Sequence, residues 1–191
     1  MLCMTKDSCL IVVDVQNDFC PGGALGVKDG DKIIPVLNRW IREFKRQHLP
    51  IVFTQDWHPM DHSSFTQQGG IWPPHCVQNT WGAQLHRDLA VDGEICRKGY
   101  YPEIEAYSAF DGTIGDPKGQ SLDMWLKAHG VRVLYVGGLA TDYCVKATVL
   151  DALEKGYQVV VIREGIRAVN VNPKDGDIAV SQMLQAGAIV K

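Results

Sequence analysis

"VRVLYVGGLATDYCVKAT", residues 131–148, holds a strand, a turn and the start of a helix in one stretch. Its first half is apolar and rich in valine, which is typical of a strand buried on both faces. The segment from Asp142 to Gly156 is predicted to be helical and to end at its glycine. Cys144 is therefore expected near the N-terminus of a helix that follows a buried strand.

The same alternation of strand and helix extends along the chain in both directions. Apolar runs at 9–15, 50–57 and 157–164 predict further strands, and residues 31–48, 121–130 and 174–186 predict helices. Short strands are expected at 94–99 and 188–190. Such alternation is typical of a parallel sheet covered on both faces, so we expect a single α/β domain over 1–191, a three-layer α/β/α sandwich. A (β/α)8 barrel would need about 250 residues.

Composition narrows the class of partner. The net charge is -3 and the pI is about 6.0, which disfavours nucleic acid and anionic membranes as partners. No apolar run approaches the roughly 18 residues that span a bilayer, and the N-terminus lacks the features of a signal peptide. Six cysteines occur without a Cys-x-x-Cys pair. Reduced thiols and a cytoplasmic location are therefore expected.

Four chemically reactive residues stand at the predicted carboxyl ends of four strands. Asp14, Asp56 and Lys98 close three strands, and Cys144 lies just beyond a fourth. In open α/β sheets, ligands bind at this edge. We therefore expect the four side chains to converge on one site.

The roles of three of these residues can be anticipated from their chemistry. The helix N-terminus would lower the pKa of the Cys144 thiol, making it a nucleophile. Asp14 could accept the thiol proton, and Lys98 could keep Asp14 charged. The alternatives are a structural buried cysteine and exposed charges at strand ends.

A second constellation suits a metal ion. Asp56 and His58 alternate along an extended segment, and His75 follows in the rigid "WPPHC" frame. One carboxylate with two imidazoles fits zinc, manganese or iron(II), although these residues could also serve without metal. His62 is either a fourth ligand or a hydrogen-bonding neighbour. Aromatic side chains that would line a pocket, or else pack in the core, are Phe19, Trp72 and Tyr107.

Five blocks in this order resemble the nicotinamidases of the isochorismatase-like hydrolase family. They are "DVQNDFCPGGALGV", "QDWHPMDHSSF", "WPPHCVQNTWGAQLH", "KGYYPEIEAYSAFDG" and "GLATDYCVKAT", and the resemblance runs from about residue 10 to residue 165. It implies a central, mostly parallel six-stranded sheet between layers of helices.

The resemblance also implies roles for individual residues. The catalytic triad would be Asp14, Lys98 and Cys144, and the oxyanion hole would be the backbone N–H groups of Ala140 and Cys144, with a cis peptide at Leu139–Ala140. The implied metal ligands are Asp56, His58 and His75, with zinc favoured over manganese or iron(II). The implied substrate contacts are Phe19, Trp72 and Tyr107.

The activity implied is hydrolysis of nicotinamide, and of pyrazinamide, through a cysteine thioester, in NAD salvage. The rival interpretations are a biuret or N-carbamoyl amidase, an isochorismatase, and a non-catalytic metal-binding or redox-responsive protein. The first generally lacks the metal ligands and the second the nucleophilic cysteine. The sequence leaves open whether His62 or Ser64 contacts the metal, and whether the chain forms a homo-oligomer.

Overall fold

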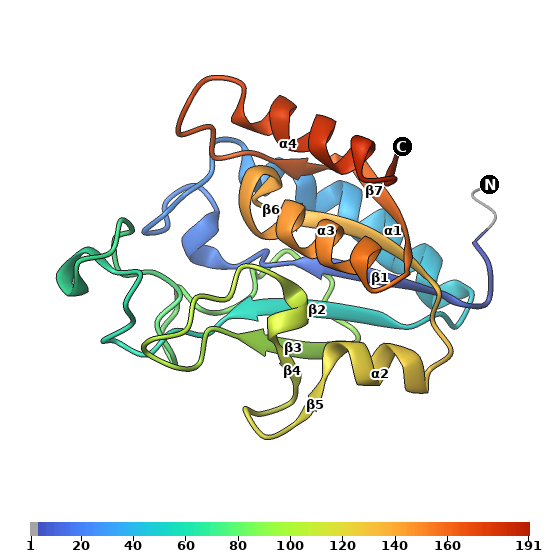
Figure 1. Cartoon of the computed structure of the whole chain (residues 1–191), viewed down its shortest axis with the longest axis horizontal. Helices are drawn as coiled ribbons and strands as arrows, with labels where there is room; N and C mark the ends of the chain where they lie inside the picture. Colours follow the sequence, from blue (N-terminus) through green and yellow to red (C-terminus); the bar gives the residue numbers. More distant parts are fainter. Residues whose placement is uncertain (1–3) are drawn as a thin grey trace.

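The structure is a computed structural model that describes residues 4–191. At its centre lies a β-sheet with helices on both faces (Figure 1). Its strands lie in the order β5-β4-β3-β2-β1-β6-β7-β8. In chain order they are β1 (Ser8–Val13), β2 (Ile51–Asp56), β3 (Glu94–Lys98), β4 (Thr113–Ile114), β5 (Gln120–Ser121), β6 (Val133–Leu139), β7 (Gln158–Arg167) and β8 (Ile189–Val190).

The predicted fold class is confirmed, but its strand number needs correction. The six strands from β3 across to β8 are parallel to one another, as expected. Two further strands, β4 and β5, extend the β3 edge in antiparallel pairing. Each has only two residues, and none of them is buried. Strands this short and exposed leave no apolar run in the sequence, so the pattern could not predict them.

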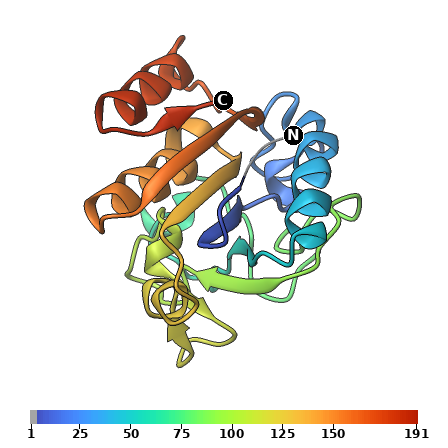
Figure 2. The same cartoon turned by 90° about the vertical axis from the view of Figure 1, so that its right-hand side faces the viewer.

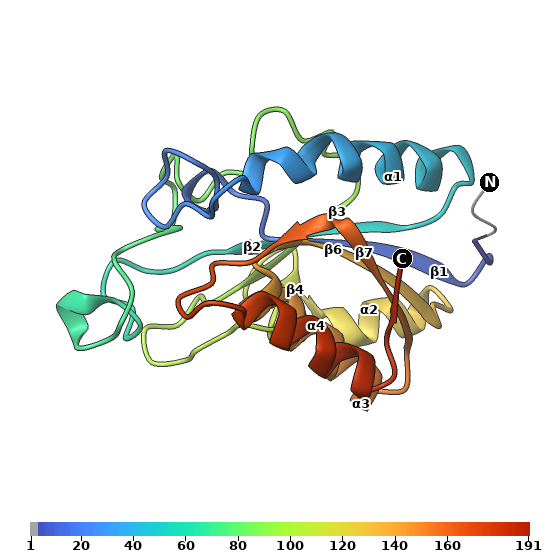
Figure 3. The same cartoon turned by 90° about the horizontal axis from the view of Figure 1, so that it is seen from above.

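The helices form the two outer layers. Helix α1 (Ile34–Arg46) covers one face, and α2 (Leu122–Ala128), α3 (Lys146–Glu154) and α4 (Asp175–Gln185) cover the other (Figures 2 and 3). Strand β1 is buried along its whole length, and its side chains pack against both helical layers. Leu10 and Val12 belong to the core cluster on the α1 side, while Ile11 and Val13 belong to the cluster on the opposite side. This explains why the strand is apolar from Cys9 to Val13 and does not alternate with polar residues.

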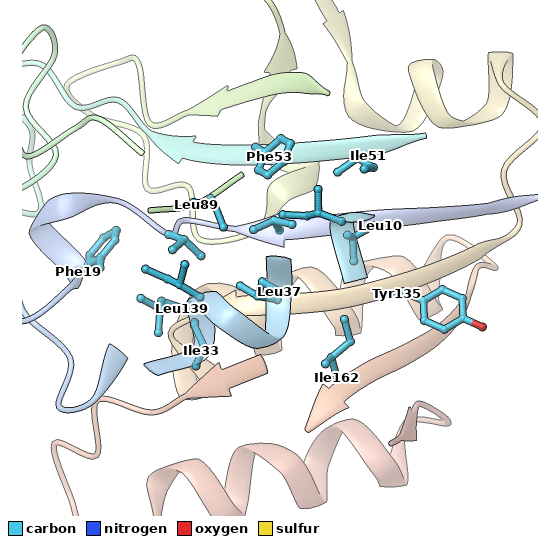
Figure 4. Close-up of a cluster of buried hydrophobic side chains, with 14 of the residues drawn as sticks. Leu10, Phe19, Ile33, Leu37, Ile51, Phe53, Leu89, Tyr135, Leu139 and Ile162 are labelled. Atoms are coloured by element: carbon cyan, nitrogen blue, oxygen red, sulfur yellow. The ribbon is translucent and has the colours of Figure 1, made fainter. Parts of the chain in front are cut away.

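Helix α1 docks through one apolar stripe. Ile34, Leu37, Ile41 and Phe44 are buried at helical spacing, and Pro35 occupies the first turn, where its missing N–H is not needed. Figure 4 shows the cluster beneath this helix, where Leu37 lies among side chains from the sheet. Burial of each such side chain contributes about 1.5–3 kcal/mol, so the packing of α1 against the sheet stabilises the fold.

Long loops gather at the carboxyl ends of the parallel strands. In Figure 1 the arrowheads of β2 and β3 point toward these loops, and the C-terminus lies at the other end of the molecule. The longest is the loop 57–93 between β2 and β3. Among residues 4–191, no helix combines the length and apolar character needed to cross a bilayer.

Candidate active site

Strand order brings the four predicted residues together. Asp14 directly follows β1, while Asp56 and Lys98 are the last residues of β2 and β3 and face each other in the register of that strand pair. Cys144 lies in the turn after β6, the other neighbour of β1. The four residues thus come from four adjacent strands of one sheet edge.

Lys98 is at the centre of this group. It is fully buried, and its Nζ lies 2.9 Å from Asp14 Oδ2 and 3.6 Å from Cys144 Sγ. It also forms an ion pair with Asp56 and donates to the Ala106 carbonyl at 2.9 Å. Burial alone would lower the pKa of Lys98, but the two carboxylates hold it well above its usual range. The ammonium therefore remains charged.

Asp14 has one carboxylate oxygen held and one available. The Thr54 hydroxyl donates to Oδ1, whereas Oδ2 finds no hydrogen-bond partner of good geometry within residues 4–191, although Lys98 lies beside it. A carboxylate oxygen of Asp14 and the sulfur of Cys144 lie within 4.8 Å. Burial raises the pKa of Asp14, and Lys98 opposes this rise. Asp14 is therefore well placed to accept a proton from the thiol.

The expected lowering of the Cys144 pKa is wrong, because the net shift is upward. Only 5% of the residue is exposed, and burial raises the pKa of its thiol well above the usual range. Lys98 lowers that pKa, but Asp14 and Asp56 raise it further. Burial and the two nearby carboxylates thus disfavour the thiolate. The thiol rests protonated, so forming the thiolate requires a base.

The turn that carries Cys144 is tightly built. Strand β6 ends in a cis peptide at Leu139–Ala140, as the resemblance implies, and a π-helical turn over Thr141–Val145 leads into α3. The Asp142 carboxylate accepts the backbone N–H groups of Val169 and Asn170, which ties the turn to the segment after β7. Ala140 and Cys144 both line a pocket, so the oxyanion hole that the resemblance implies stays a prediction at a position open to a ligand.

Three side chains beside this group could hold a metal ion. Asp56, His58 and His75 each offer a ligand atom, and these atoms lie within 4.8 Å of one another. His58 Nδ1 lies 3.2 Å from the Gly99 carbonyl, and His75 Nδ1 lies 2.8 Å from the Pro73 carbonyl. If each Nδ1 carries the proton for its carbonyl, each Nε2 keeps a lone pair for a metal. The residues present therefore fit a divalent ion.

Electrostatics favour the same interpretation. Burial would by itself raise the pKa of Asp56, but Lys98 and His58 hold it below its usual range. Burial lowers the pKa of His75. An ionised carboxylate and a neutral imidazole are the forms that bind metal.

His62 lies outside this group of donors. Its Nε2 lies 3.1 Å from the Ile104 carbonyl, and its Nδ1 accepts the Ser64 N–H at 3.2 Å and lies 2.8 Å from the Ser64 hydroxyl. Both ring nitrogens are therefore engaged with protein atoms. Ser64 itself lines the pocket.

The pocket joins the nucleophile to the metal donors. Phe19, Trp72 and Tyr107 line it, as predicted, and the Trp72 indole donates to the Tyr107 hydroxyl at 3.1 Å. The sequence analysis missed Tyr143, whose ring packs edge-on against Trp72 at 5.1 Å; it directly precedes Cys144, which was the available signal. The remaining lining residues are Leu25, Asp56, His58, Ser64, His75, Glu105, Ala106, Ala140, Cys144 and Val169.

Comparison with known proteins gives a consistent picture. The model of the isochorismatase domain matches residues 8–191. The nicotinamidase of Escherichia coli (strain K12) is 45% identical over 196 aligned positions, covering 94% of this chain and 92% of that protein. The pyrazinamidase of Pyrococcus horikoshii in complex with zinc superposes with a TM-score of 0.88 at 45% identity, over 97% of this chain and 98% of that chain. PnC1 from L. infantum in complex with nicotinate superposes with a TM-score of 0.86 at 36% identity, over 100% of this chain and 96% of that chain.

Proposed function

Since this chain belongs to the isochorismatase family, we propose that it hydrolyses nicotinamide to nicotinate and ammonia, with pyrazinamide as a second substrate, and so serves NAD salvage. The observation that carries the proposal is the position of one buried ammonium. Lys98 Nζ lies 2.9 Å from Asp14 and 3.6 Å from the Cys144 sulfur, and it forms an ion pair with Asp56. Base, nucleophile and one candidate metal ligand thus share a single cation.

The first half of the reaction forms a thioester. The Asp14 carboxylate takes the thiol proton from Cys144, and the sulfur attacks the carboxamide carbon. Lys98 stabilises the charge that develops near the sulfur, and the N–H groups of Ala140 and Cys144 bind the oxyanion. Asp14 then returns its proton to the leaving nitrogen, the C–N bond breaks and ammonia departs.

The second half releases the acid. Asp14 is again ionised and takes a proton from a water molecule, whose oxygen attacks the thioester carbon. The C–S bond breaks, the sulfur regains a proton and nicotinate forms. The same carboxylate thus acts as base and acid in both halves.

The substrate ring is held at the other end of the pocket. Asp56, His58 and His75 would hold a divalent cation, zinc in our proposal, whose chemistry is to take the pyridine nitrogen as a ligand and orient the ring. The rings of Phe19 and Trp72 would pack against the flat substrate. The rival carbamoyl amidases generally lack such metal donors, so this set favours a nicotinamidase.

The setting of the thiols supports a cytoplasmic enzyme. Cys9, Cys20, Cys76 and Cys96 are buried free thiols, as is Cys144. Unpaired thiols are typical of proteins in reducing compartments. Cys3 lies outside the described residues.

The test is ammonia release from nicotinamide. Cys144→Ala should lower kcat by more than about a thousandfold, because it removes the nucleophile. Cys9→Ala is the matched control, since Cys9 is a buried thiol of the same core cluster but lies near the start of β1. Turnover by Cys144→Ala close to that of Cys9→Ala would contradict the thioester mechanism, and a parent enzyme without activity on nicotinamide would contradict the function.

A further inference from the structure

Side chains replace the backbone ladder between β1 and β2 where the site begins. The ladder pairs Leu10 with Ile51, Ile11 with Val52 and Val12 with Phe53, and then it stops. Asp14 has a φ of +46°, which turns β1 out of extended geometry. Beyond this point the two strand ends need another means of staying in register.

Gln16 provides the main link beyond the ladder. Its Oε1 accepts the Asp56 N–H at 2.8 Å, and its Nε2 donates to the Asp56 carbonyl at 2.8 Å. The Nε2 also donates to the Ala83 carbonyl at 2.8 Å, within the loop after β2. Gln16 is fully buried, so these bonds have no competition from water. Its amide thus binds both polar atoms of the Asp56 backbone.

The peptide that Gln16 holds belongs to Asp56, whose two carboxylate oxygens face different partners. One Asp56 oxygen forms the ion pair with Lys98, and the other lies 3.6 Å from His58 Nε2. The carboxylate can serve both neighbours only if its backbone does not rotate. A displacement of about 1 Å in a supporting element is enough to weaken such a constellation.

We propose that Gln16 is a positioning residue that fixes Asp56 for metal binding and so keeps the metal donors in register with Asp14. The inference rests on the metal assignment within the proposed function. It assigns Gln16 no contact with substrate. Its effect is transmitted through the Asp56 peptide, because partners of metal ligands set ligand orientation.

The chain offers a closely matched control in Gln55. This glutamine is also buried, and its Nε2 donates to the same Ala83 carbonyl at 3.0 Å. Its Oε1 accepts from Arg97 at 3.2 Å, and its amide makes no bond to the Asp56 backbone. Gln16→Met and Gln55→Met therefore both remove a buried amide bonded to Ala83, and they differ in the link to Asp56.

The experiment measures zinc affinity of the purified, metal-stripped protein by competition with a chromophoric chelator. We expect Gln16→Met to bind zinc about tenfold or more weakly than the parent, within the range typical of lost ligand partners. Gln55→Met should stay within about twofold of the parent, since its amide does not hold a metal ligand. Should Gln16→Met not fold, Gln16→Asn, which keeps an amide but is one methylene shorter, should show the same weakening.

Two outcomes in the variants would overturn the inference. One is parental zinc affinity in the folded Gln16 variant, and the other is an equal loss in Gln55→Met, which would reflect general loosening around Ala83. Because zinc affinity is measured without substrate, a parent that binds zinc but does not hydrolyse nicotinamide would refute the proposed function and leave this comparison valid. A parent that binds no zinc would refute the metal assignment and this inference with it.

Discussion

The buried ammonium of Lys98 affects the pKa of the titratable groups around it. Burial raises the pKa of both Asp14 and Cys144, and Lys98 opposes the rise in each. With Lys98 in place, Asp14 can be ionised next to a protonated thiol. That combination is what proton transfer from the nucleophile requires.

Removal of this cation should destabilise the protein in a pH-dependent way. In Lys98→Met, two buried carboxylates lose their partner, and at about pH 8 we expect a loss of about 3–5 kcal/mol in the free energy of unfolding. Without Lys98 the pKa of Asp14 in the folded state rises further above its unfolded value. A folded state that binds the extra proton loses stability as pH rises through that pKa. The deficit should therefore be smaller at about pH 5.

Urea unfolding of the metal-free parent and variant at the two pH values measures this effect. Lys127→Met is the control, because Lys127 pairs with Asp123 on the surface and is 64% exposed. Its effect should stay below about 1 kcal/mol at both pH values. A Lys98→Met deficit that is equal at both, or greater at the lower pH, would contradict the coupling to Asp14.

Single residues were predictable where their strand position was visible in the sequence. Asp14 and Lys98 each end a recognisable strand. Gln16 and Thr54 were not singled out, because their partners lie 40 residues away along the chain. The sign of the Cys144 pKa shift depends on burial beside two carboxylates, which no local pattern reveals.

At the scale of elements, the β6–α3 unit was predicted as a strand, a turn and a helix. Its π-helical turn was not, because five residues of altered hydrogen bonding leave no distinct period in the sequence. Gly138, in the stretch quoted at the start, does more than favour a turn. Gly138 has a φ of +133°, and a Cβ there would lie 2.0 Å from the Val13 carbonyl oxygen. The backbone of β6 thus approaches β1 closely just before the turn that carries Cys144.

Gly138→Ala should therefore be far more costly than an alanine at another glycine of positive φ. Gly130, two residues after the end of α2, has a φ of +66°, and a Cβ added there would meet open space. Gly130→Ala should cost about 1–2 kcal/mol, the strain of a left-handed residue alone. Gly138→Ala adds a backbone clash and should cost several times more, with loss of ammonia release. Thermal unfolding of both variants checks this, and similar melting temperatures would contradict the close approach.

At the scale of the whole molecule, the parallel topology places the nucleophile and the metal donors in one pocket, although they lie far apart in the sequence. The nucleophile follows β6, and the metal donors lie at the end of β2 and in the loop after it, yet both strands neighbour β1 and deliver their residues to the same sheet edge. This convergence could be predicted from strand ends alone. The full pocket wall could not, because Leu25, Tyr143 and Val169 come from three separate segments. Their meeting depends on tertiary packing.

The central claim is that the thiol and the metal donors act on one flat substrate. A pyridine nitrogen can bind a metal, whereas the C–H of benzamide cannot. The decisive measurement is kcat/KM for nicotinamide and benzamide in the zinc-loaded parent and in His75→Ala. We expect the parent to favour nicotinamide by more than about tenfold, which corresponds to about 1.4 kcal/mol of transition-state stabilisation. In His75→Ala the preference should shrink toward parity. Equal rates in the parent, or an undiminished preference in His75→Ala, would contradict the claim.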